Sequence, residues 1–207
     1  MKQKLDIETW KRKAHFRFFS TFEEPFYGIC AAIDCTEAYS VAKSQGISVF
    51  LYCLHRSLLA IHRSEPFKYR IENDEVLIYE RIDAAITVAR DNGTFGYGHI
   101  AYSENLQEFL EAANCEVERV RGLTDLVPSG VNNTILYSAL PWIDFTSLSH
   151  ARKGSFADSR PRISFGKMTE NSGKRSMPVS IHVHHALVDG LDVGQYLECF
   201  QGVMNQH

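Results

Sequence analysis

Residues 179–204 constrain the possible fold more than any other part of the chain. Residues 179–184 (VSIHVH) alternate apolar and polar side chains, which is the period-two pattern of a half-buried strand. A short loop with Asp189-Gly190 follows, and from Val193 to Met204 apolar residues recur at the spacing of an amphipathic helix. The segment therefore predicts a strand that leads directly into a helix.

The remaining patterns predict an α+β fold. Apolar spacing, turn signals and cap signals predict helices over 6–14, 36–46, 47–61 and 106–120, and strands over 26–33, 68–71, 75–79, 84–88, 94–102, 135–140 and 163–167. The strands at 68–71, 75–79 and 84–88 are expected to form a meander. Because hairpin strands mix with long helices without regular βαβ alternation, we expect a two-layer α+β sandwich of helices on one large mixed sheet.

The composition indicates one globular domain over residues 1–207, since the sequence contains no repeat or Pro/Gly-rich linker. A net charge of −3 and a pI of about 6.3 argue against nucleic acid as a partner. No apolar run approaches the ~20 residues of a membrane helix, and the N-terminus lacks a signal peptide pattern. The five cysteines include no CxxC pair, which favours reduced thiols in the cytoplasm.

The end of the 179–184 strand carries the residues best suited to chemistry. A histidine there is rigidly supported and can accept a proton near neutral pH, and His185 is the candidate. Three histidines within four residues could instead bind a metal. Against this, His182 and His184 lie on one strand face and His185 on the other, and no acidic or cysteine ligand has metal-site spacing. We therefore favour catalysis and expect no metal.

Residues 184–190 (HHALVDG) match the HHxxxDG motif of CoA-dependent acyltransferases, a group that includes chloramphenicol acetyltransferases, dihydrolipoyl acyltransferases and condensation domains. The rest of the chain resembles the chloramphenicol acetyltransferases. Residues 138–147 (SALPWIDFTS) are similar to their SALPW-x-x-F-x-S segment, and Trp10, Arg12, His15 and Phe16 are similar to their W-x-R-x-x-H-F block. The PSGV run at 128–131 also agrees, so the resemblance covers essentially the full length and implies that family's fold.

The resemblance implies a role for each matching residue. His185 would be the general base that removes the proton of an acceptor hydroxyl, which attacks the thioester of acetyl-CoA. Ser147 would donate a hydrogen bond to the tetrahedral oxyanion, and Ser164 takes the place of a threonine that helps to hold a water. Asp189 and Arg12 would pair and brace the active-site backbone. Both substrates would bind together, without a covalent intermediate and without a permanently bound cofactor.

The resemblance also identifies positions that contact the substrates. Chloramphenicol or a similar small alcohol is the expected acceptor. The implied acceptor-pocket positions are Phe19 in place of a tyrosine, Pro25 in place of a small residue, Tyr27 in place of a phenylalanine, Tyr97 in place of an alanine, and the matching Phe95 and Phe145. At the CoA end, Lys167 matches a lysine and Met168 replaces a tyrosine.

The resemblance further implies a homotrimer, in which His185 of one subunit faces a pocket formed largely by its neighbour and including Ser147. Two alternatives stay open at this point. The chain could be a dihydrolipoyl acyltransferase-like catalytic domain, although the sequence has no lipoyl domain or flexible linker. It could also be a non-catalytic protein that sequesters an apolar ligand, in which case His185 would be idle.

Overall fold

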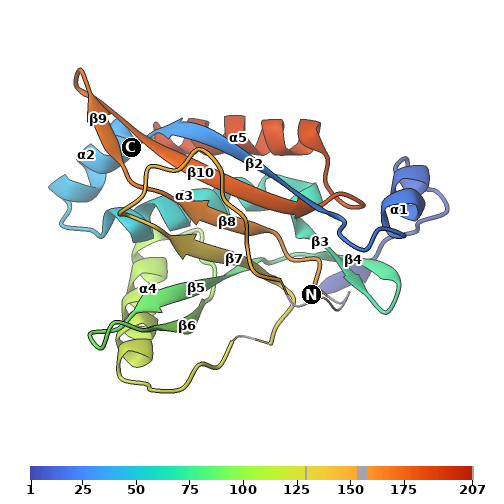
Figure 1. Cartoon of the computed structure of the whole chain (residues 1–207), viewed down its shortest axis with the longest axis horizontal. Coiled ribbons are helices and arrows are strands. Elements are labelled where there is room, and N and C mark those ends of the chain that lie inside the picture. The colour runs from blue at the N-terminus through green and yellow to red at the C-terminus, as the bar shows by residue number, and fades with distance from the viewer. Residues whose placement is uncertain (129, 153–157, 207) are drawn as a thin grey trace.

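The structure is a computed structural model that describes residues 1–128, 130–152 and 158–206 (Figure 1). Its centre is a seven-stranded sheet. The strand order is β2 (Phe26–Asp34), β10 (Lys174–His184), β8 (Arg162–Phe165), β7 (Thr134–Ala139), β5 (Asp83–Ala89) and β6 (Phe95–Ile100), with β9 (Thr169–Asn171) beside one end of β10. The sheet is mixed as predicted, because β7 runs parallel to both of its neighbours and the other pairs are antiparallel.

Helices cover one face of this sheet. They are α2 (Thr36–Ser44), α3 (Val49–His62), α4 (Leu106–Arg121) and α5 (Gly190–Met204), while α1 (Lys13–Phe19) lies beyond the end of β2 and β10 (Figure 1). The side chains of Ser48 and Asn105 cap α3 and α4 by accepting backbone N–H groups. Gly46 adopts a φ of 67° after α2, as expected of a glycine beyond a helix end.

A buried polar contact joins helices and sheet. The hydroxyl of Ser57 on α3 lies 2.8 Å from that of Tyr137 on β7 and 2.7 Å from that of Tyr196 on α5. All three side chains are almost completely buried. Because buried hydroxyls are costly unless they are paired, this contact fixes the positions of α3 and α5 on the sheet.

The predicted meander was wrong. The hairpin of β3 (Tyr69–Glu72) and β4 (Glu75–Tyr79) forms as expected, with positive φ angles at Asn73 and Asp74. Strand β4, however, also pairs with β1 (Lys2–Lys4), which is too short and too polar to be predicted from the sequence. The strands β1, β4 and β3 therefore form a separate three-stranded sheet. Strand β5 joins the large sheet instead, because its residues Asp83–Val88 are buried on both faces apart from Thr87.

The predicted first helix was also wrong. Asp6 accepts hydrogen bonds from the amide of Glu8 and the hydroxyl of Thr9, so it organises a turn. The helix begins only at Lys13. This shift places Arg12 immediately before α1, with its side chain buried.

Candidate active site

His185 lies immediately after β10, and its backbone is held on both sides. Its N–H donates to the carbonyl oxygen of Pro25 at 2.8 Å. Its carbonyl oxygen accepts from the Arg12 guanidinium at 3.3 Å. Since Pro25 directly precedes β2, the neighbour of β10, the sheet register itself fixes where the imidazole lies.

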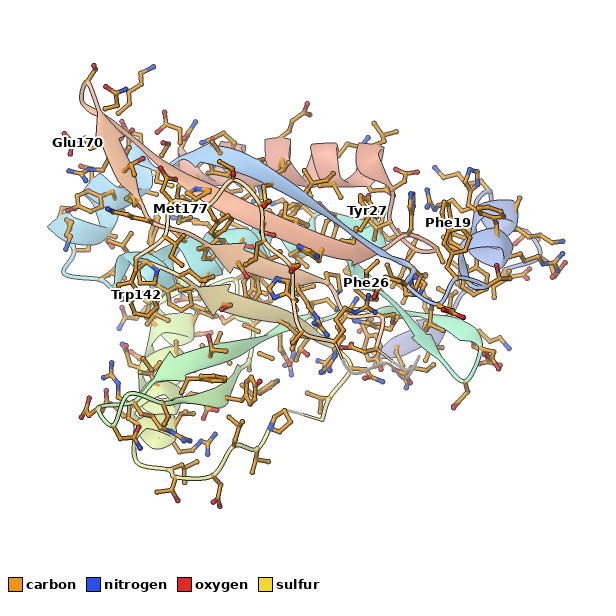
Figure 2. The ribbon with its side chains drawn as sticks, in the orientation of Figure 1. Phe19, Phe26, Tyr27, Trp142, Glu170 and Met177 are labelled. Carbon is orange, nitrogen blue, oxygen red and sulfur yellow. The ribbon has the colours of Figure 1, made fainter. Side chains whose placement is uncertain are left out.

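Two aromatic rings contact the His185 imidazole. Phe19, the last residue of α1, stacks on it with centroids 3.9 Å apart and planes 11° from parallel. Tyr27 on β2 contacts it at 4.5 Å with a tilt of 42°. Phe19 and Tyr27 lie together at the end of the molecule near α1 (Figure 2). These contacts leave the imidazole partly exposed and restrict its rotation.

An ion pair supports the backbone around His185. Arg12 pairs with Asp189, and its guanidinium also lies 3.7 Å from Asp192. Asp189 caps α5 by accepting the amides of Leu191 and Asp192, and Asp192 accepts the amide of Asp189 in return. Burial alone would raise the pKa of Asp189, but the amide of Asp192 and the charge of Arg12 outweigh it and lower the pKa. Burial and the charge of Asp189 raise the pKa of Asp192.

The two neighbouring histidines have structural partners on the other face of β10. The ring of His184 accepts the amide of Ala186 at 3.3 Å, and burial followed by the charge of Arg152 lowers its pKa to about 4. The Nε2 of His182 lies 3.0 Å from the carbonyl oxygen of Leu148. No group of three or more metal-type ligands occurs in residues 1–128, 130–152 and 158–206.

Ser164 lies in a polar row on the sheet face opposite the helices. On β8 it pairs with Ser180 of β10 on one side and with Ser138 of β7 on the other. On β5, the neighbour of β7, Ile86 pairs with Tyr137, so the next residue, Thr87, lies beside Ser138. Thr87 in turn pairs with Tyr97 on the edge strand β6, and the polar row therefore reaches the edge of the sheet. Ser164 is completely buried, and its hydroxyl lies 3.4 Å from Nε2 of His150.

The segment that carries Phe145 and Ser147 packs closely on the end of β8. Gly166 permits this approach, since a Cβ there would lie 2.8 Å from the Phe145 ring and 2.9 Å from the carbonyl oxygen of Ile143. The amide of Lys167 donates to that same oxygen. Phe145 is buried, whereas Ser147 is exposed.

Met168 lines an apolar cavity of about 230 Å³ between the helices and the sheet. The cavity lies near the end of β10 that is remote from His185, because Met177 also lines it and seven residues of strand, about 23 Å, separate Met177 from His184. Met177 and Phe19 accordingly lie on opposite sides of the molecule in Figure 2. Lys167 is exposed beside this cavity.

The predicted site residues therefore form two groups in one chain. The base cluster comprises Arg12, Phe19, Pro25, Tyr27, His185 and Asp189, which are joined by the contacts given above. The remaining predicted residues, called the pocket group here, share only that no hydrogen bond or ring contact among the described residues joins them to the base cluster; they are Phe95, Tyr97, Phe145, Ser147, Ser164, Lys167 and Met168. In the described residues no hydrogen bond joins Ser147 to His185, and β6 with Tyr97 is four strands, about 19 Å, from β10. Ser129 of the predicted PSGV run lies outside the described residues.

Sequence reasoning missed three residues around the base cluster. The Asp189-x-x-Asp192 spacing is a capping box signal that would have identified Asp192. Phe18 and Phe22 form a ring cluster with Phe19 at centroid distances of 5.1 to 5.2 Å, and both are exposed. The repeated phenylalanines at 16, 18, 19 and 22 were visible in the sequence, but helical spacing alone does not tell which rings stay exposed.

Comparisons with known proteins identify the family that the chain resembles. A family profile described as chloramphenicol acetyltransferase matches residues 2–201. A chloramphenicol acetyltransferase of Bacillus pumilus is 28% identical over 92% of this chain and 88% of its own length. Chloramphenicol acetyltransferase 3 of Escherichia coli is 26% identical over 98% of this chain and 96% of its own.

Solved structures show the same likeness. A chloramphenicol acetyltransferase superposes with a TM-score of 0.92 at 29% identity, over 99% of this chain and 100% of that one. A probable dihydrolipoamide acetyltransferase from Listeria monocytogenes reaches 0.69 at 13% identity, over 94% of this chain and 89% of that one, which indicates a shared fold alone. Among the described residues, the helices include none that is long and apolar enough to span a bilayer.

Proposed function

The chain belongs to the chloramphenicol acetyltransferase family, and on that premise we propose that it transfers the acetyl group of acetyl-CoA to a hydroxyl of chloramphenicol or of a similar small alcohol. The observation that carries the proposal is the placement of His185. Its backbone is hydrogen bonded to Pro25 and Arg12, and its ring is stacked on Phe19. A partly exposed imidazole held in this way is suited to general base catalysis.

His185 would act in both halves of the reaction. Its unprotonated ring nitrogen takes the proton of the acceptor hydroxyl while the hydroxyl oxygen attacks the thioester carbonyl carbon. The tetrahedral intermediate then expels CoA as the C–S bond breaks, and the imidazolium returns its proton to the departing sulfur. The Arg12–Asp189 pair supports this role by fixing the His185 carbonyl group and the start of α5.

Ser147 would donate its hydroxyl hydrogen to the oxyanion, an interaction worth about 3 to 4 kcal/mol in a preorganised site. Its exposure in the single chain supports contact with a group from elsewhere. Ser164 would hold a water near the reacting atoms, and its place in the polar row opposite the helices supports a position beside bound acceptor.

Both groups of residues would contribute contacts to the substrates. Phe19, Pro25 and Tyr27 would contact the acceptor from the side of His185, and Phe95, Tyr97 and Phe145 from the other. The cavity beside Met168 would accept part of CoA, with the exposed Lys167 near its phosphates. The large side chain of Tyr97 would narrow the acceptor pocket, so we expect the preferred alcohols of this protein to differ in size from those of relatives with alanine there.

The active protein would be a homotrimer with its sites between subunits. The separation of the base cluster from the pocket group within one chain supports this proposal, because a neighbouring subunit could supply the missing half. We also propose the cytoplasm as its location, which the five free thiols support.

The test is thiol release from acetyl-CoA with purified protein and chloramphenicol, with dihydrolipoamide as a competing acceptor and His185→Ala as the control. We expect release with chloramphenicol that disappears in the variant. Transfer to dihydrolipoamide alone would assign the other branch of the superfamily. CoA binding without transfer to any alcohol would contradict an enzymatic role.

A further inference from the structure

The segment that carries Ser147 is held on the sheet by a histidine of β10. Nε2 of His182 lies 3.0 Å from the carbonyl oxygen of Leu148, the residue that follows Ser147. A carbonyl oxygen can only accept a hydrogen bond, so Nε2 carries the hydrogen and donates it. Before Ser147, the carbonyl oxygen of Ile143 accepts the amide of Lys167. The described hydrogen bonds therefore hold the main chain on both sides of Ser147.

A glycine on the neighbouring strand makes room for the His182 imidazole. In the register of β10 with β2, His182 pairs with Gly28. A Cβ at position 28 would lie 2.5 Å from Cε1 and 2.6 Å from Nε2 of the His182 ring. Any other residue at this position would have to displace the ring, and with it the nitrogen that donates to Leu148.

A second histidine, His150, packs against the first from the segment itself. Its ring meets the His182 ring edge-on, with centroids 4.8 Å apart, and its Nε2 lies 3.4 Å from the hydroxyl of Ser164. Burial is the largest cause that lowers the pKa of both imidazoles, that of His150 to about 4. Both rings are therefore neutral near pH 7, and the one N–H of His182 is directed to Leu148.

We propose that His182 is a positioning residue for Ser147, and that it acts by holding the carbonyl group of Leu148. Ser147 is exposed, so the contacts of its main chain decide where its hydroxyl oxygen lies. A displacement of about 1 Å can cost up to about a hundredfold in rate, which makes such a contact important for a donor aimed at an oxyanion. This inference deepens the proposed function and rests on the role given there to Ser147.

Two variants of His182 separate the hydrogen bond from the volume of the ring. His182→Gln keeps an N–H at about the place of Nε2, whereas His182→Leu fills the space without a donor. The first readout is the crystal structure of each variant and of the unmodified protein, which needs no activity. We expect Ser147 to keep its place in His182→Gln and to move by about 1 Å in His182→Leu. An unmoved Ser147 in His182→Leu would overturn the proposal.

The second readout is acetyl transfer. We expect His182→Leu to lower kcat about tenfold with the KM for both substrates nearly unchanged, and His182→Gln to stay within about twofold of the unmodified protein. Equal losses in the two variants, or a rise in KM alone, would contradict a role through the hydrogen bond. If the unmodified protein transferred no acetyl group while Ser147 still moved in His182→Leu, the proposed function would fail and the positioning contact would stand.

Gly28→Ala tests the same contact from the side of β2. The added Cβ meets the His182 ring, so we expect this change alone to lower kcat by a factor similar to that of His182→Leu. Added to His182→Leu, where no ring is present, it should lower kcat hardly further. Losses that multiply in the double variant would mean that Gly28 acts independently of His182, and would overturn the proposal.

Discussion

Arg12 and Asp189 are 177 residues apart in the sequence and form an ion pair directly beside His185. The pair ties the segment before α1 to the first turn of α5, and through Arg12 it also holds the His185 carbonyl group. One guanidinium therefore connects three segments that meet at the end of β10.

Replacing Arg12 with Met should weaken both stability and catalysis. The change leaves Asp189 and Asp192 close together without their cation. We expect a loss of about 1 to 3 kcal/mol in the free energy of unfolding, less than for a fully buried pair because the Asp189 side chain is 36% exposed. Urea denaturation and kcat measure the two effects. Arg17→Met, which removes an exposed arginine of α1, is the control and should change neither by much.

The stability of the protein should fall as the pH decreases from about 6.5 to 4. The pKa of His184 is about 4 in the folded protein, whereas a histidine in an unfolded chain titrates near ~6.5. Between these values the unfolded state binds a proton that the native state does not. The contribution of His184 is thus complete above pH 6.5 and is lost on acidification, by about 2 to 3 kcal/mol.

Denaturant titrations at pH 7 and pH 5 test this prediction. His184→Asn keeps an acceptor for the amide of Ala186 and does not titrate, so its stability should depend less on pH in this window. His15→Asn, on the exposed side of α1, should keep the full dependence. Equal pH dependence in all three proteins would refute the assignment to His184.

Gly166→Ala should destabilise the protein and impair transfer together. The added Cβ would lie 2.5 Å from Pro178 and 2.9 Å from the carbonyl oxygen of Ile143, and a backbone atom cannot move away cheaply. We expect a loss of about 1 to 3 kcal/mol and a displacement of the segment that carries Ser147. Gly202→Ala on α5 has open space around it, so thermal denaturation should show a gain of about 0.5 to 1 kcal/mol.

The local patterns of the sequence predicted most elements of the large sheet and its helices, because alternation and helical spacing are recorded residue by residue. They failed where pairing is decided by distant segments. Nothing in the polar residues 2–4 indicates that they pair with β4, and this pairing separates β3 and β4 from β5.

The candidate site was likewise predictable only in part from the sequence. The motif at 184–190 identified His185 and Asp189, and the resemblance named Pro25 and Tyr27 as pocket positions, but only the structure shows that Pro25 and Tyr27 contact His185 itself. Phe95 and Ser147 belong to the same predicted site, but among the described residues neither makes a hydrogen bond or ring contact with His185.

Mixing two inactive variants would test whether the site is shared between subunits. His185→Ala lacks the base and Ser147→Ala lacks the oxyanion donor, so each alone should have strongly reduced kcat. When the two are unfolded, mixed in equal amounts and refolded together, an interface that unites the intact His185 of one variant with the intact Ser147 of the other regains a complete site.

Random assembly of a trimer from equal amounts of the two variants makes about one interface in four complete, so about a quarter of the activity should return. If each site lay within one chain, every site would lack one residue and mixing would restore nothing. The variants refolded separately and combined afterwards are the control, because subunits that do not exchange cannot form mixed interfaces.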